Sequence, residues 1–103
     1  MSEINAIGIS VIIPIYNVEL YIERCVRSLM EQTLENIEFI FVNDCTPDKS
    51  MIILQRVLEE YPVRKEKVKI IEHKQNKGIA ATRNTGLKYV SGPVSYTHLR
   101  AHE

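Results

Sequence analysis

The stretch that decides the fold is ISVIIPIYN at residues 9–17, an apolar run that ends in a tyrosine and a turn-forming asparagine. Residues 9–14 form a continuous apolar segment of the kind that is buried on both faces of a parallel sheet. A second such segment ends in the polar sequence NDCTPD at residues 43–48. In an open α/β sheet, ligands bind just beyond the carboxyl ends of the strands. The two polar ends therefore predict one shared site, with side chains suited to a nucleotide base.

Apolar spacing continues this pattern along the chain. Paired apolar residues after Asn17 predict a helix, with Asn17 as its cap and Glu19 in its first turn. Residues 37–42 predict a second strand. The turn-forming residues 46–48 predict the start of a second helix, and Pro62 is expected to end it.

Two further elements complete the pattern. Residues 68–72 predict a third strand, and residues 79–89 predict a third helix after a polar loop. The alternation βαβαβα predicts a Rossmann-like, three-layer α/β/α fold with a parallel, doubly wound sheet. Beyond Gly92 only residues 94–97 have strand propensity, and the regular pattern stops there.

The composition is that of an ordinary globular domain. The chain has 103 residues and a mass of 11.9 kDa, 45% of its residues are hydrophobic, and its formal net charge is +0. This neutral balance lacks the basic surface of a nucleic-acid-binding protein, and the apolar runs are too short to span a bilayer. The N-terminus lacks the features of a signal peptide. We therefore expect a cytoplasmic protein, the inner face of the membrane included, with no transmembrane segment and no nucleic-acid partner.

Two residues at the strand ends suit a nucleotide base. Tyr16 follows the first strand, where an aromatic ring can stack on a base; a partly buried core tyrosine is the alternative. Asp44 follows the second strand, where a carboxylate can accept the N3–H of uracil; a turn or helix-capping aspartate is the alternative. Asp48 lies beside the next helix start, and we expect it to cap that helix rather than to act in catalysis.

A third cluster, Asn76-Lys77-Gly78, precedes the last predicted helix. Gly78 can adopt a positive φ in a tight loop. Arg83, one turn or more into the helix, can reach a diphosphate with its planar guanidinium, or it can be a solvated helix arginine. The three histidines have no metal-binding spacing, so we expect no metal site in this chain. The glycine-rich loops of dinucleotide-binding proteins and P-loop NTPases are absent from the sequence.

Four phrases occur in order along the chain: SVIIPIYN at 10–17, SLMEQT at 28–33, VNDCTPDKS at 42–50 and GIAATRNTG at 78–86. Together they resemble the N-terminal, nucleotide-binding half of family 2 glycosyltransferases of the GT-A fold, over roughly residues 8–92. The resemblance implies an inverting enzyme that moves a sugar from a nucleotide-sugar, often UDP-linked, to a hydroxyl of a glycan or lipid-linked acceptor. Polysaccharide or cell-envelope synthesis is the setting that it implies.

The resemblance also implies a donor site at four positions: Pro14, Tyr16, Asp44 and Arg83. The proline and the tyrosine would line the base pocket, the aspartate would bind the base, and the arginine would lie near the diphosphate. Asn43 and Cys45 differ from the Asp and Gly of the commonest form of this motif. That difference bears on the geometry of the turn.

The family's next motif is missing from the sequence. In these enzymes the next strand ends in Asp-x-Asp, which holds Mn²⁺ or Mg²⁺ against the departing diphosphate, and a catalytic base lies later still. Residues 93–103 resemble a stretch that recurs as a sequencing or cloning artefact at the ends of unrelated proteins. We therefore expect residues 1–92 to be the donor-binding part of an incomplete GT-A domain, and residues 93–103 to be a non-native tail.

Two expectations follow from that incompleteness. The chain itself should hold no metal and should be inactive, although Mn²⁺ or Mg²⁺ is expected for the full-length enzyme. The strand order should be three-two-one, with residues 94–97 paired weakly beside the first strand or loose. A non-catalytic nucleotide-binding α/β module is the alternative function.

Overall fold

The computed structural model describes residues 8–33 and 36–97. Strands and helices alternate along this part of the chain: β1 (Ile9–Ile15), α1 (Ile22–Met30), β2 (Ile37–Asn43), α2 (Ser50–Leu58), α3 (Pro62–Lys65), β3 (Val68–Glu72), α4 (Ile79–Leu87) and β4 (Val94–Tyr96). The strands form one parallel sheet in the order β3-β2-β1-β4. The predicted fold class and the order three-two-one of the first strands are confirmed.

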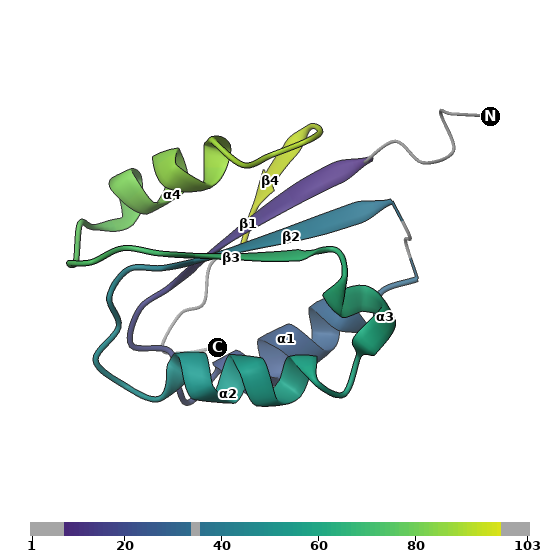
Figure 1. The fold of residues 1–103 in the computed structure, drawn as a ribbon, viewed down its shortest axis with the longest axis horizontal. Coiled ribbons are helices and arrows are strands. Elements are labelled where there is room, and N and C mark those ends of the chain that lie inside the picture. Colours follow the sequence, from purple (N-terminus) through teal and green to yellow (C-terminus); the bar gives the residue numbers. More distant parts are fainter. Residues whose placement is uncertain (1–7, 34–35, 98–103) are drawn as a thin grey trace.

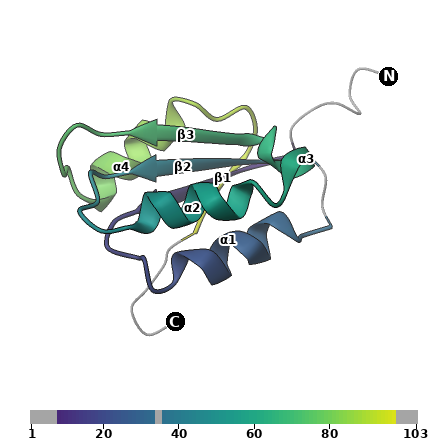
Figure 2. The same ribbon diagram turned by 60° about the horizontal axis from the view of Figure 1, so that its bottom comes forward.

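The sheet separates two layers of helices (Figure 1). Helices α1 and α2 lie over one face, as Figure 2 shows from a second direction, and α4 lies over the other. Alternate residues of β1 and β2 point to opposite faces of the sheet. Val11 and Ile13 belong to the larger core beneath α1 and α2, and Ile12 and Ile40 belong to a smaller cluster on the opposite side. Burial on both faces explains why the strand sequences are continuously apolar.

Helix α4 packs closely on β1 because Gly86 has no side chain. A Cβ atom at this position would lie 2.6 Å from Cγ2 of Ile12, closer than real side chains approach. Ile12 is fully buried in the middle of the sheet, so its side chain could shift only by disturbing its packed neighbours. Gly86 therefore sets the distance between α4 and the sheet.

The first helix starts later than predicted. Asn17 does not cap it: its φ is 54°, and its N–H donates instead to Oγ1 of Thr46 at 2.8 Å. The helix begins at Ile22, so Glu19 lies in the preceding loop, where its N–H donates to Oδ2 of Asp48 at 3.0 Å. These two bonds join the loop after β1 to the loop after β2, and α1 itself begins without a side-chain cap.

The second helix starts just after the predicted turn, with Lys49 rather than Asp48 as its N-cap residue, and it ends earlier than predicted. Asp48 lies just before the N-cap residue Lys49, and its Oδ1 accepts the N–H of Ser50, the first residue of α2, at 3.1 Å. The helix ends at Leu58 rather than at Pro62. Pro62 instead begins α3, where a missing N–H does no harm in the first turn.

A buried carboxylate fixes the chain that leads into β4. Glu38 is 4% exposed and accepts hydrogen bonds from Oγ of Ser10 at 2.6 Å and from the N–H of Ser91 at 2.6 Å. Burial works to raise the pKa of Glu38, but these hydrogen bonds and the charge of Lys69 hold it below its usual range. Residues 94–96 then pair with β1, which confirms the paired form of the predicted edge strand. Within residues 8–33 and 36–97, no helix is long and apolar enough to cross a membrane.

Candidate functional site

The carboxyl ends of β1 and β2 lie side by side. Ile15 is the register partner of Asn43, so Tyr16 and Asp44 follow from neighbouring positions, and the N–H of Asp44 donates to the carbonyl of Ile15 at 3.0 Å. The last residue of β3 is in turn paired with Asn43. The loop after β3 therefore reaches the same edge of the sheet.

A tight turn follows β2 at this edge. Cys45 has a φ of 57°, in the left-handed region that glycine adopts without strain. Oδ1 of Asn43 accepts the N–H of Thr46 at 2.9 Å, which closes the turn through a side chain. The turn therefore has the backbone conformation that suits glycine, although a cysteine occupies it.

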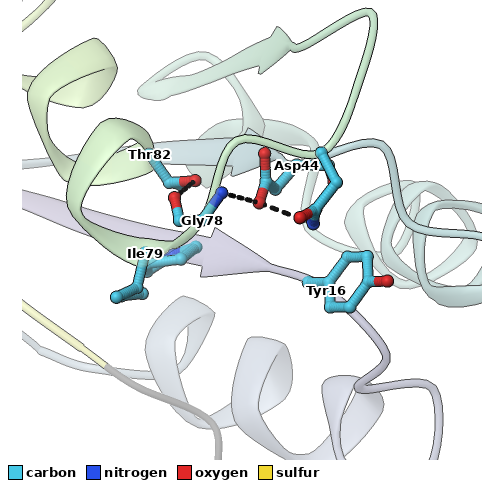
Figure 3. Close-up of a pocket in the computed structure, with 7 residues that line it drawn as sticks. Tyr16, Asp44, Gly78, Ile79 and Thr82 are labelled. Carbon is cyan, nitrogen blue, oxygen red and sulfur yellow. Dashed lines mark hydrogen bonds between the residues drawn. The ribbon is translucent and has the colours of Figure 1, made fainter.

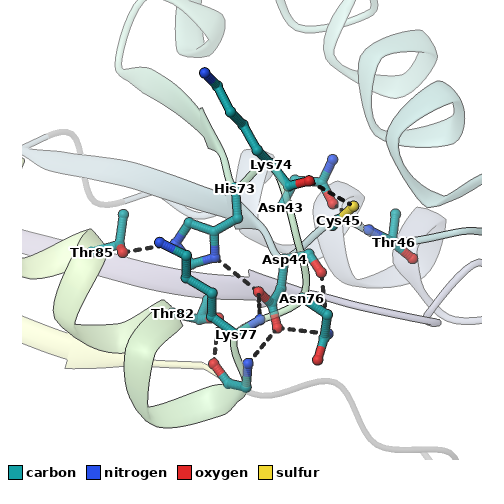
Figure 4. A network of polar contacts seen from close by, with 11 residues as sticks. Asn43, Asp44, Cys45, Thr46, His73, Lys74, Asn76, Lys77, Thr82 and Thr85 are labelled. Carbon is teal, nitrogen blue, oxygen red and sulfur yellow. Dashed lines mark hydrogen bonds and ion pairs between the residues drawn. The ribbon is translucent and has the colours of Figure 1, made fainter.

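The carboxylate of Asp44 is buried and accepts four hydrogen bonds (Figure 4). Oδ1 accepts from Nδ1 of His73 and from the N–H of Lys77, both at 2.8 Å. Oδ2 accepts from Nδ2 of Asn76 and from the N–H of Gly78, both at 2.9 Å. Burial works to raise the pKa of Asp44, but the bonds from His73 and the two backbone N–H groups hold it below its usual range. Asp44 is thus an anion that anchors the loop between β3 and α4.

His73 connects this anion to α4. Its side chain is 6% exposed, and its Nε2 lies 2.7 Å from Oγ1 of Thr85. One turn earlier in the helix, Oγ1 of Thr82 donates to the carbonyl of Gly78 at 2.7 Å. The start of α4 is therefore fixed both through Asp44 and within the helix itself.

A pocket of about 310 Å³ opens beside Asp44 (Figure 3). Its lining comes from the ends of β1 and β2, the loop after β3 and the first turn of α4: Pro14, Tyr16, Asp44, Asn76, Gly78, Ile79 and Thr82. Tyr16 is 43% exposed and lies at the rim of this pocket. A flat aromatic face beside a carboxylate and an amide is an arrangement that suits a planar heterocycle.

The structure brings together three of the four predicted donor-site residues. Pro14, Tyr16 and Asp44 line the pocket, whereas Arg83 does not. The guanidinium carbon of Arg83 lies 5.1 Å from the ring centroid of Tyr96 on β4, a cation–π distance. Its contact with a diphosphate stays a prediction.

Sequence reasoning missed three side chains that shape this site. His73 has no metal-binding spacing, but its place directly after β3 puts it at the edge where ligands bind. Thr82 and Thr85 are three positions apart on α4, a spacing that places both on one helix face. That spacing was the available signal for the pair.

The described residues do not fit a Mn²⁺ or Mg²⁺ ion. Within them, no group of three or more His, Cys, Asp or Glu side chains could hold a metal. Both oxygens of Asp44 already accept hydrogen bonds from protein donors. A metal of the complete enzyme would therefore need ligands other than these.

Residues 10–97 match the model of glycosyl transferase family 2. The chain belongs to this family. Among curated relatives it is 45% identical over 84 residues to the uncharacterized glycosyltransferase EpsJ of Bacillus subtilis, covering 82% of this chain and 23% of EpsJ. It is 48% identical over 85 residues to the minor teichoic acid biosynthesis protein GgaB of the same organism, covering 81% of this chain and 9% of GgaB.

Solved structures of similar fold include nucleotide complexes. TarS 1–349 of S. aureus in complex with UDP superposes with a TM-score of 0.77 at 28% identity, over 89% of this chain and 27% of that chain. The mannosyltransferase PcManGT of Pyrobaculum calidifontis in complex with GDP-Man and Mn²⁺ gives 0.73 at 25% identity, over 80% and 24%. The chain thus spans between 9% and 27% of the length of these four proteins.

Proposed function

We propose that this chain is the donor-binding part of a family 2 glycosyltransferase that uses a uridine diphosphate sugar. The observation that carries the proposal is the pocket that Tyr16 and Asp44 both line. Tyr16 offers an aromatic face to this pocket, and Asp44 offers a carboxylate. The UDP complex of TarS, a protein of similar fold, supports a uridine nucleotide. Pro14 completes the wall beside the base, and Arg83 is assigned to the diphosphate.

Asp44 selects uracil by exchanging one of its hydrogen bonds. A carboxylate has about four acceptor positions, and protein donors fill all four. Asn76 is the exposed donor among them, so its amide is the one that the base displaces most easily. The N3–H of uracil then donates to Oδ2, and the released amide can donate to a carbonyl oxygen of the base. Cytosine carries an acceptor at N3, which Asp44 repels.

The remaining functions are assigned to the complete enzyme. The name of GgaB, a minor teichoic acid biosynthesis protein, supports a role in cell-envelope polymer synthesis. The glycan or lipid-linked acceptor and the cytoplasmic face of the membrane are proposals that rest on the family resemblance. The metal ion and the catalytic base are assigned to parts of the enzyme that this sequence lacks. Residues 93–103 are proposed as non-native although the family match runs to residue 97. Sequencing of the source DNA beyond codon 92 tests this boundary. A different reading frame that encodes an Asp-x-Asp motif after the next strand would support the proposal, and a native DNA sequence that encodes residues 93–103 would contradict it.

Calorimetric titration of the purified chain with UDP and with CDP tests the base pocket. We expect UDP to bind about tenfold or more tightly than CDP, because a hydrogen bond to a charged group contributes about 1.5–3 kcal/mol. Tyr16→Ala should weaken the binding of both UDP and CDP by about 1–3 kcal/mol, since every base can stack on an aromatic ring. Tyr89→Ala is the matched control, because Tyr89 is equally exposed but lies outside the pocket. Equal affinity for UDP and CDP, or equal effects of the two tyrosine variants, would reject the proposal.

A further inference from the structure

We propose that His73 is a positioning residue for base recognition. Through Nδ1 it holds the carboxylate of Asp44 in the orientation that lines the pocket, and through Nε2 it ties that orientation to α4 at Thr85. The inference rests on the proposed function, because it assigns His73 a role in how Asp44 reads the base.

The chemistry of the partners determines where the proton of His73 lies. The ionised carboxylate of Asp44 can only accept, so Nδ1 carries the hydrogen of the 2.8 Å bond. In the neutral ring Nε2 is then an acceptor, and the hydroxyl of Thr85 donates to it across 2.7 Å. A threonine hydroxyl can also accept, so a protonated ring would keep both bonds. The arrangement therefore fixes the ring in either charge state.

Among the four donors to Asp44, His73 is the buried side chain. Its ring is 6% exposed, whereas Asn76 is exposed and the other two donors are backbone N–H groups. The backbone of His73 is also fixed, since its N–H donates to the carbonyl of Asn43 at 2.8 Å. When the base displaces Asn76, the ring of His73 and the two N–H groups are what keep the carboxylate from rotating.

Three substitutions of His73 separate its two bonds. His73→Asn places an amide donor near the position of Nδ1 and keeps the bond to Asp44. His73→Gln places its amide near the position of Nε2 and keeps only the approach to Thr85. His73→Ala removes both. Unfolding curves of the three variants show which proteins are folded before any nucleotide is added.

The measured quantity is the ratio of UDP to CDP affinity, which a merely structural role would leave unchanged. We expect His73→Ala and His73→Gln to reduce this ratio about tenfold, and His73→Asn to restore it to within about threefold of wild type. A wild-type chain that discriminates between UDP and CDP, together with an unchanged ratio in folded His73→Ala or His73→Gln, overturns this inference alone. A wild-type chain that does not discriminate overturns the proposed function as well.

A spectroscopic measurement decides the geometry without any nucleotide. Imidazole nitrogen-15 spectra of the full chain, with His73 assigned by its loss in His73→Asn, should show the neutral ring protonated on Nδ1. In Asp44→Ala the proton should move to Nε2, because the acceptor for Nδ1 is gone. A neutral wild-type ring protonated on Nε2 overturns the inference.

Discussion

Asp44→Asn tests the central anion of the site with the smallest change in shape. The substitution replaces one carboxylate oxygen by an amide NH₂, which cannot accept a hydrogen bond. If the NH₂ takes the place of Oδ1, it faces the ring of His73 and the N–H of Lys77. If it takes the place of Oδ2, it faces Asn76, which can turn outward, and the N–H of Gly78. The second orientation is less costly, because an exposed side chain can find water.

The magnitude follows from the bonds that remain. The N–H of Gly78 is left without its acceptor, which costs about 1–3 kcal/mol for a buried group. The bonds to Oδ1 survive but lose the charge, and each falls by about 1 kcal/mol from the charged to the neutral range. We therefore expect Asp44→Asn to lower the free energy of unfolding by about 3–5 kcal/mol near neutral pH.

Urea-induced unfolding measures this loss, and amide hydrogen exchange locates it. Protection should fall at Lys77 and Gly78, whose N–H groups Asp44 binds. Glu72→Gln is the matched control: this exposed carboxylate at the end of β3 is expected to change stability by less than about 0.5 kcal/mol. A loss in Asp44→Asn no larger than in the control, or unchanged protection of both amides, would refute the assignment of Asp44 as the anchor.

The stabilisation by Asp44 should also depend on pH, in a direction that its pKa determines. The folded-state pKa of Asp44 lies below its ordinary value of 3.8, so the wild-type chain releases this proton more readily when folded. Its stabilisation is present above pH 3.8 and is lost as pH falls through the folded-state pKa. The difference between wild type and Asp44→Asn should therefore be largest near neutral pH and shrink below pH 3.8.

Three further outcomes follow from the structure. Cys45→Gly should raise the free energy of unfolding by about 0.5–1 kcal/mol. The substitution removes the strain of a left-handed φ, and this gain exceeds the extra backbone entropy that glycine loses on folding. A variant that is less stable in urea unfolding would contradict the turn geometry. Gly86→Ala should lower it by about 1–2 kcal/mol, since the clash with Ile12 outweighs the gain in helix propensity, and a stabilised variant would show that α4 is not held this close to β1. The chain should give no metal-dependent transfer from radiolabelled UDP-sugars with Mn²⁺ and a panel of acceptors, and turnover above a mock preparation would show that its catalytic groups are present.

The architecture could be predicted because each strand is buried on both faces. Burial of Ile12 and Ile13 on opposite sides of β1 requires an uninterrupted apolar run, which the sequence shows directly. The starts and ends of helices were harder, because they depend on partners in distant loops. Asn17 has the local chemistry of a cap, but its φ of 54° lies outside the conformation of a cap residue, and its N–H is bound by Thr46 from 29 positions away. Helix α1 begins later, at Ile22. Local propensity carries no information about such a partner.

Only the part of the site that the sheet positions could be predicted from the sequence. Sheet topology alone places Tyr16 and Asp44 together, since parallel strands end at one edge. The partners of Asp44 come from a loop 29 to 34 positions later in the chain, and their number depends on the path of that loop. Arg83 illustrates the limit of helical spacing: it lies one position beyond Thr82, which lines the pocket, yet its guanidinium lies over Tyr96.

The start of α4 bears on where the diphosphate of the proposed donor can bind. Helix N-termini commonly bind phosphate through free N–H groups and the positive end of the helix dipole. Here the N–H groups of Lys77 and Gly78, which precede the first turn of α4, donate to Asp44, so a carboxylate lies at the positive end of the helix dipole. A diphosphate placed there would be repelled by this carboxylate. Under the proposed function, the helix terminus holds Asp44 for the base, and we expect the diphosphate of the donor to depend on cationic groups elsewhere, Arg83 and the metal site of the complete enzyme among them.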